Sequence, residues 1–68
     1  RMTPKGLDQV IRTLREKKGF TQEELAFKAK VNPGYVAQLE LGLHKNPSLD
    51  VVRRLARALG VRLSELLG

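Results

Sequence analysis

Hydrophobic residues recur at helical intervals along most of the chain. Near the start, Leu7, Val10, Ile11 and Leu14 are separated by three, one and three positions, with mostly polar residues between them. This spacing places the apolar side chains on one face of an α-helix. Gly19 suits the end of that helix, because glycine readily adopts the left-handed conformation beyond a last turn. The pattern predicts a helix over about residues 7–18.

A second helix is predicted to follow Thr21. Thr21 and Glu24 have the spacing of a capping box, in which each side chain binds the backbone N–H of the other residue. Phe20, just before the cap, is placed to pack on the residue at position 25. The residues expected to face inward are Leu25, Ala26 and Ala29.

The third predicted helix begins a few residues later. Asn32 is a favourable N-cap, and Pro33 takes the first helical position, where a missing N–H costs nothing. Val36 and Leu39 are expected to face the core, and Gly42 to end the helix.

Two more helices are predicted after a loop at residues 43–47. Ser48 is the expected cap of the fourth helix and Gly60 its end, and a short fifth helix is expected at about residues 63–67. The inward residues of the fourth helix are predicted to be Leu49, Val52, Leu55, Ala56 and Leu59.

These elements define an all-α fold. The sequence has no alternating apolar and polar run of the kind that predicts a strand. Five short helices with tight connections predict an orthogonal five-helix bundle. We expect a single domain over residues 7–68, preceded by a flexible N-terminal tail at residues 1–6.

Charge points to a polyanionic partner. The 68 residues contain 13 Lys and Arg against 7 Asp and Glu, a net charge of +6. This excess favours nucleic acid first and an anionic membrane surface second, but the basic residues are spread over the helices and do not form one amphipathic face. With no Cys and a single His, neither a metal site nor a cofactor is expected. No catalytic trio is available around that His, so an enzyme is not expected. Because small secreted domains usually need disulfides, the lack of Cys favours a cytoplasmic location.

The joint between the second and third helices carries the most specific signal. Only residues 30–32 separate them, which suits a helix-turn-helix. The chain resembles the Cro/repressor (Xre-type) helix-turn-helix family in the segments TQEELA (21–26), VN (31–32), YVAQLELG (35–42), LARALGV (55–61) and LSELL (63–67). The resemblance extends over about residues 7–67. It implies a lambda repressor-like fold and a regulator that binds double-stranded DNA with its third helix, about Pro33–Leu41, in the major groove.

The outer face of the third helix is the candidate base-reading surface. At about 100° per residue, the side opposite the core includes Gln38, whose amide suits adenine, and Ala37 and Leu41, which suit thymine methyl groups. The predicted base-contact residues are Asn32, Pro33, Gly34, Ala37, Gln38 and Leu41. Pro33 and Gly34 stand where the family has base-reading side chains. We therefore expect sparse base readout, with much of the affinity from phosphates and DNA shape.

The resemblance also implies phosphate contacts and an internal ion pair. The predicted phosphate-contact residues are Arg15, Thr21, Gln22, Tyr35, His44, Lys45, Asn46 and Ser48. Arg15 and Glu40 match family positions that pair, so an Arg15–Glu40 ion pair is expected. The family usually has glycine where this chain has Lys30. Either Lys30 takes a left-handed conformation, at a cost of about 1–2 kcal/mol, or the turn differs locally.

Two functional hypotheses follow. The first is a transcription regulator, most simply a repressor, that binds DNA as a homodimer. Its dimer interface is predicted at Val61, Leu63, Leu66 and Leu67. The alternative is a helix-turn-helix module that holds a protein partner, such as an antitoxin or a polymerase-binding cofactor. An apolar Leu41 on the outer face of the third helix motivates the alternative.

Overall fold

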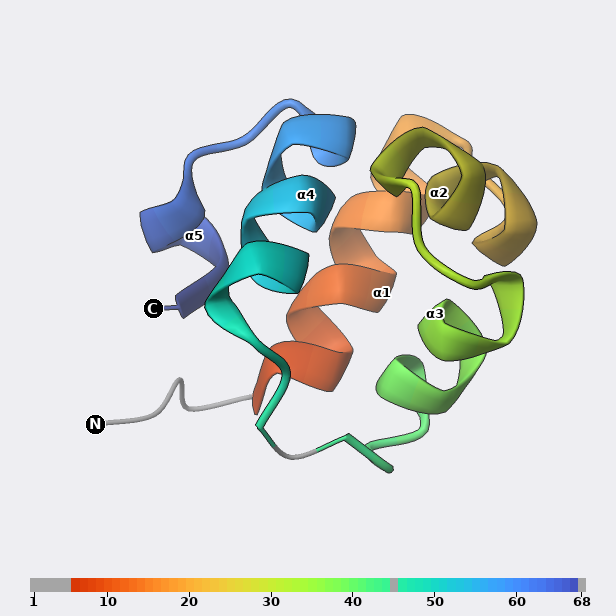
Figure 1. Ribbon diagram of the computed structural model, residues 1–68. Helices are drawn as coiled ribbons and strands as arrows, with labels where there is room; N and C mark the ends of the chain where they lie inside the picture. The colour runs from red at the N-terminus through yellow and green to blue at the C-terminus, as the bar shows by residue number, and fades with distance from the viewer. Residues whose placement is uncertain (1–5, 45, 68) are drawn as a thin grey trace.

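The computed structural model describes residues 6–44 and 46–67, over which the elements are α-helices and there is no strand (Figure 1). The helices are α1 (Gly6–Lys18), α2 (Gln22–Ala29), α3 (Pro33–Glu40), α4 (Leu49–Leu59) and α5 (Leu63–Leu67). The predicted all-α fold is confirmed. Helix α1 begins at Gly6, one residue inside the predicted tail, and the rest of that tail lies outside the described residues.

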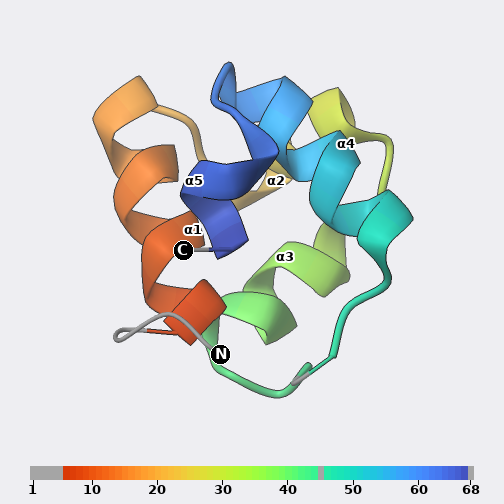
Figure 2. The same cartoon turned by 90° about the vertical axis from the view of Figure 1, so that its left-hand side faces the viewer.

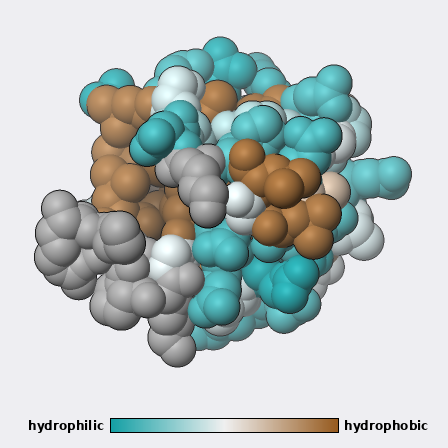
Figure 3. All heavy atoms as spheres, turned by 90° about the horizontal axis from the view of Figure 1, so that it is seen from below, coloured by the Kyte–Doolittle hydropathy of each residue, from teal (hydrophilic) through white to brown (hydrophobic). Residues whose placement is uncertain are grey.

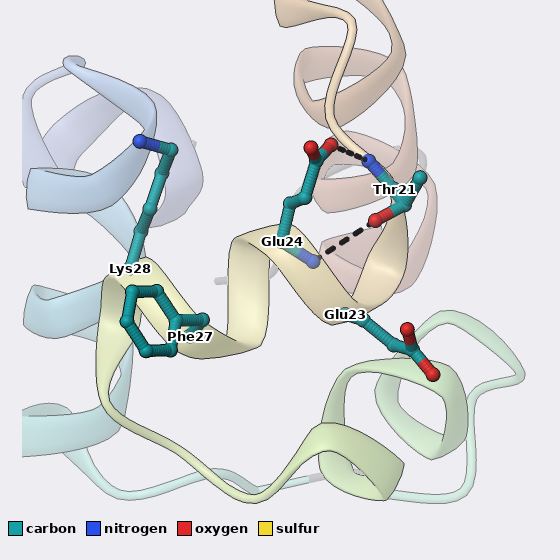
Figure 4. Close-up of a pocket in the computed structure, with 5 residues that line it drawn as sticks. All are labelled: Thr21, Glu23, Glu24, Phe27 and Lys28. Carbon is teal, nitrogen blue, oxygen red and sulfur yellow. Dashed lines mark hydrogen bonds between the residues drawn. The ribbon is translucent and has the colours of Figure 1, made fainter.

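The predicted N-caps are present at three helices. The Thr21 hydroxyl accepts the N–H of Glu24 at 3.0 Å, and the Glu24 carboxylate accepts the N–H of Thr21 at 2.8 Å, which completes the capping box (Figure 4). Asn32 caps α3 through the N–H of Gly34, and Ser48 caps α4 through the N–H of Val51. Each cap gives a partner to a backbone donor that the helix itself leaves unpaired.

Four helices end in the same hydrogen-bond arrangement. A left-handed residue follows the last turn, and its N–H and that of its successor return to that turn, as in a Schellman motif. Glycine fills the left-handed position at the ends of α1, α3 and α4, but Lys30 fills it after α2, with φ 59° and ψ 44°. Lys30 therefore bears the strain and the turn keeps the usual path.

The core lies where all five helices meet. Helix α2 packs on α3 and α4, α1 packs on α3, and α5 lies against α1 and α4 (Figure 2). The buried apolar residues are Ile11, Leu25, Ala26, Ala29, Val36, Leu39, Val52, Leu55, Ala56, Leu59 and Leu66. The inward prediction for Leu49 was wrong, because its side chain is 50% exposed. Leu49 is the first residue of α4 and lies about 70° from the centre of the buried stripe at 100° per residue.

A buried carboxylate joins three helices. The side chain of Glu40, at the end of α3, has no exposed surface. Its oxygens accept the Nε–H of Arg15 on α1 at 2.6 Å and an Nη2–H of the same guanidinium at 3.1 Å. The amide of Gln22 on α2 donates to it at 3.0 Å, and Arg12 Nε lies 3.6 Å away. The predicted Arg15–Glu40 ion pair is therefore present.

The charge of Glu40 is stabilised despite its burial. Desolvation is the largest single influence and favours the neutral acid, but the hydrogen bonds from Arg15 and Gln22 and the charges of Arg15 and Arg12 together outweigh it. The pKa of Glu40 therefore lies below its ordinary value. The hydrogen bond to Glu40 in turn raises the pKa of Arg15. This network fixes α3 against α1 and the start of α2.

Lys30→Gly should stabilise the domain by about 1 kcal/mol, because glycine takes the left-handed conformation without the Cβ penalty. The free energy of unfolding, from urea denaturation, measures the effect. Lys17→Gly, at an exposed position inside α1, is the matched control and should destabilise by about 1 kcal/mol. A loss of stability in Lys30→Gly would contradict the strain at this turn.

Glu40→Gln should destabilise the domain by about 3 kcal/mol at neutral pH, because it leaves the largely buried Arg15 without its charged partner. The unfolded chain protonates Glu40 near pH 4.3, whereas the folded protein keeps it ionised to lower pH. The contribution of Glu40 is therefore complete above about pH 4.3 and is lost as the pH falls through the folded-state pKa.

Urea denaturation at several pH values checks this. The stability difference between wild type and Glu40→Gln should narrow as the pH is lowered from neutral to about 3. Glu16→Gln is the control, because its carboxylate is 63% exposed and lies 3.9 Å from Arg15. It should cost less than about 0.5 kcal/mol. A difference that does not change with pH would argue against an ionised Glu40.

Candidate nucleic-acid interface

The outer face of α3 lies away from α1 and α2, the helices on which α3 packs. Helix α3 packs on α1 and α2 through its buried residues, which leaves Pro33, Gly34 and Gln38 exposed and Ala37 half-buried. Leu41, the residue that caps the helix, is 68% exposed. The predicted base-contact residues therefore lie together along one accessible strip.

The start of α3 is suited to close approach by a polyanion. Its first turn contains no acidic residue, and Pro33 and Gly34 add little side-chain bulk over the backbone. Asn32 accepts the Gly34 N–H at 2.9 Å through Oδ1, so the NH₂ group of its amide stays available as a donor. A base edge or a phosphate at this point would meet one oriented amide and otherwise backbone.

The end of α3 carries a cluster of three side chains. The Schellman motif at Gly42 turns the chain back, with the Leu43 N–H bonded to the Gln38 carbonyl at 3.0 Å. As a result, the ring of His44 stacks on Tyr35 with centroids 4.4 Å apart, and its Nε2 lies 2.9 Å from Gln38 Oε1. Burial raises the pKa of Tyr35, so its hydroxyl remains a neutral donor at physiological pH.

The start of α2 is less favourable to phosphate than expected. Thr21 is exposed, and its hydroxyl hydrogen is free because the oxygen acts as acceptor in the capping box. However, Glu23 and Glu24 occupy the first turn and line an open hollow with Thr21, Phe27 and Lys28 (Figure 4). Two carboxylates repel an anion in that hollow, which makes this helix start a weaker phosphate site than its exposed cap alone suggests.

Arg15 is only partly available as a phosphate contact. Its side chain is 13% exposed, and three of its five N–H groups are engaged, two with Glu40 and one, on Nη1, with the Phe20 carbonyl at 2.7 Å. Arg15 therefore serves mainly the fold, with one N–H on each terminal nitrogen left for a phosphate. Gln22 is also tied to Glu40, but its amide keeps one N–H free.

The loop before α4 holds the remaining predicted phosphate contacts. Asn46 and Ser48 are exposed, and the Ser48 hydroxyl hydrogen is free because its oxygen accepts the Val51 N–H at 3.2 Å. Lys45 lies outside the described residues. Of the nearby α4 arginines, Arg54 is tied to Asp50 at 3.1 Å and to the Lys30 carbonyl.

One residue of the predicted dimer surface is inaccessible. Leu66 is completely buried, because it is the residue of α5 that enters the core, so it cannot contact a second copy. Leu67 is 45% exposed, and Val61 and Leu63 are half-buried. Seen from below, apolar surface forms separate areas among hydrophilic ones (Figure 3).

Sequence reasoning missed two features of this region. It did not predict that Gln22 and Arg12 join the Glu40 network, or that His44 contacts Gln38. Neither had a sequence signal, because both depend on how separate elements meet.

Within residues 6–44 and 46–67, no helix is long and apolar enough to cross a membrane, and no three His, Asp or Glu side chains gather as a metal site.

Comparisons with known proteins place the domain in a family. A family model described as helix-turn-helix matches residues 11–66. The regulator SlrR of Bacillus subtilis is 33% identical over 60 residues, which cover 88% of this chain and 40% of SlrR. SinR of the same organism is 34% identical over 61 residues, 90% of this chain and 55% of SinR. The chain thus spans about half or less of these relatives.

Solved structures agree with this assignment. The restriction-modification controller protein C.AhdI from Aeromonas hydrophila superimposes with a TM-score of 0.84 and 40% identity, covering 88% of this chain and 89% of that one. SinR, the master regulator for biofilm formation, solved in complex with DNA, gives a TM-score of 0.87 and 34% identity, with 91% and 98% covered. The chain belongs to the Xre-type helix-turn-helix family.

Proposed function

We propose that this chain is a sequence-specific DNA-binding transcription regulator that inserts α3 into the major groove. The observation that carries the proposal is the free outer face of α3, bearing Gln38 and no acidic side chain in its first turn. The likeness to SinR, whose structure was solved with DNA, supports it. So does the net charge of +6.

Base readout in this proposal is concentrated in two amides. Gln38 and Asn32 are the groups on the strip that combine donors and acceptors for base edges. Ala37 and Leu41 meet thymine methyl groups, and Pro33 and Gly34 bring backbone close to the DNA. The phosphate contacts are assigned to Arg15, Thr21, Gln22, Tyr35, Lys45, Asn46 and Ser48, whereas His44, predicted to join them, contacts Gln38 instead.

We propose that the regulator acts as a homodimer. Val61, Leu63 and Leu67 would form a two-fold contact, which places two α3 helices about 34–36 Å apart, one turn of DNA. Occupancy of a near-palindromic site then represses transcription. The role is not catalytic, since His44, the single His, is engaged with Tyr35 and Gln38. Binding to genomic DNA implies a cytoplasmic location.

A protein-interaction module is the second candidate. Phe27 on α2 is 84% exposed and Leu41 is 68% exposed, and large apolar side chains this accessible favour protein contacts. An antitoxin or a polymerase-binding cofactor would use them. The two candidates differ in whether the domain binds DNA by itself.

Selection from a pool of random duplexes should yield one preferred, near-symmetric sequence whose half-sites lie about one helical turn apart. Affinity for that sequence should fall steeply with salt, because phosphate contacts release counterions. Roughly six contacts would give a loss of about 10³-fold between 50 and 200 mM salt. No enriched sequence together with a flat salt dependence would favour the interaction module, and an asymmetric site would argue against the homodimer.

Gln38→Ala should weaken binding to the selected sequence by about 1–3 kcal/mol and change binding to random DNA little, because Gln38 is assigned a base and not a phosphate. Fluorescence anisotropy on both duplexes measures the difference. Gln9→Ala, an exposed glutamine on α1, is the matched control and should leave both affinities unchanged. Equal losses on both duplexes would remove Gln38 as a base-reading residue.

A further inference from the structure

The amide of Gln38 is held from one side by His44. Because an amide oxygen carries no hydrogen, the 2.9 Å contact between His44 Nε2 and Gln38 Oε1 has the Nε2–H as donor. The imidazole is itself fixed, since it stacks on Tyr35 with an interplanar angle of 24°. Tyr35 is half-buried in α3, so the ring on which His44 stacks is itself held by the helix.

This contact matters because a free glutamine is ambiguous toward DNA. Rotation of its terminal amide by 180° exchanges an acceptor for two donors, and base edges are distinguished by their order of donors and acceptors. With the proton on Nε2, the bond from His44 uses one lone pair of Oε1 and holds the amide oxygen on the side of the imidazole. The second lone pair and both N–H groups remain for a base pair.

We propose that His44 is a positioning residue that determines base specificity by fixing the orientation of the Gln38 amide. The inference rests on the proposed DNA-binding function and goes beyond it, because it gives this loop histidine a role in sequence discrimination in place of a phosphate contact. Tyr35 holds the imidazole through the stacking of the two rings. The three side chains form one recognition unit, assembled by the turn at Gly42.

His44→Phe separates the hydrogen bond from the stacking. The phenyl ring keeps the contact with Tyr35 but has no donor for Gln38, whereas His44→Ala removes both. Each variant is tested on the sequence selected by the wild type and on duplexes changed one base pair at a time, with anisotropy as the measurement. Thermal unfolding confirms that the variants are folded, as expected at a partly exposed loop position.

Gln38→Ala identifies the base pair that Gln38 reads, because this variant no longer prefers the selected base pair there. At that position, His44→Phe should lower the preference for the selected base pair over its replacements by roughly 3- to 10-fold, the value of one hydrogen bond. Discrimination at the other base pairs should stay the same. In a Gln38→Ala background, His44→Phe should have no further effect at that base pair, which a general structural role would not produce.

An equal loss of affinity for the selected sequence and for every duplex with one changed base pair would overturn the proposal. His44 would then be a phosphate contact or a structural residue. Unchanged discrimination in His44→Phe would also overturn it while leaving the DNA-binding function intact. By contrast, failure of the wild type to prefer any sequence would overturn the proposed function itself. The wild-type measurement therefore distinguishes the two failures.

Discussion

The buried carboxylate of Glu40 is the interaction on which the rest of the structure depends. It has no exposed surface, so its charge must be balanced inside the protein, and Arg15, Gln22 and Arg12 do this from α1 and α2. Apolar packing of Val36 and Leu39 holds α3 on the core, and the Glu40 network adds directed contacts at its end. Directed hydrogen bonds at the end of α3 fix its rotation, and that rotation decides which side chains face outward.

The turn between α2 and α3 sets the angle at which α3 leaves the bundle. Its left-handed position is filled by Lys30, although three other helices end with glycine at the equivalent point. The turn keeps its usual path in spite of this cost, because the packing of α2 against α3 and α4 outweighs the strain of a single residue. The geometry of the helix-turn-helix is thus imposed by the core.

The proposed recognition surface carries few side chains that can contact a base edge. Pro33 and Gly34 leave the first turn of α3 almost bare, and only Asn32 and Gln38 bring amides to the strip. Both amides are held by hydrogen bonds within the domain, Asn32 by its cap and Gln38 by His44. Fixing the few available groups before binding reduces the entropy lost on contact, which compensates for their small number.

The sequence by itself determined the features that depend on neighbours along the chain. Helix starts at Thr21 and Asn32 and the end at Gly60 follow from backbone hydrogen bonds within a few residues, and those predictions are confirmed. The family resemblance correctly paired Arg15 with Glu40, which no local rule predicts.

Tertiary structure decided everything that depends on where separate helices meet. Leu66 is buried because α5 packs on α1 and α4, whereas Leu49 is exposed because the core does not extend to the start of α4. Arg15 gives three of its five N–H groups to contacts inside the domain, which ties it mainly to the fold. His44 reaches Gln38 only through the reversal of the chain after α3, and periodicity says nothing about the path of a loop.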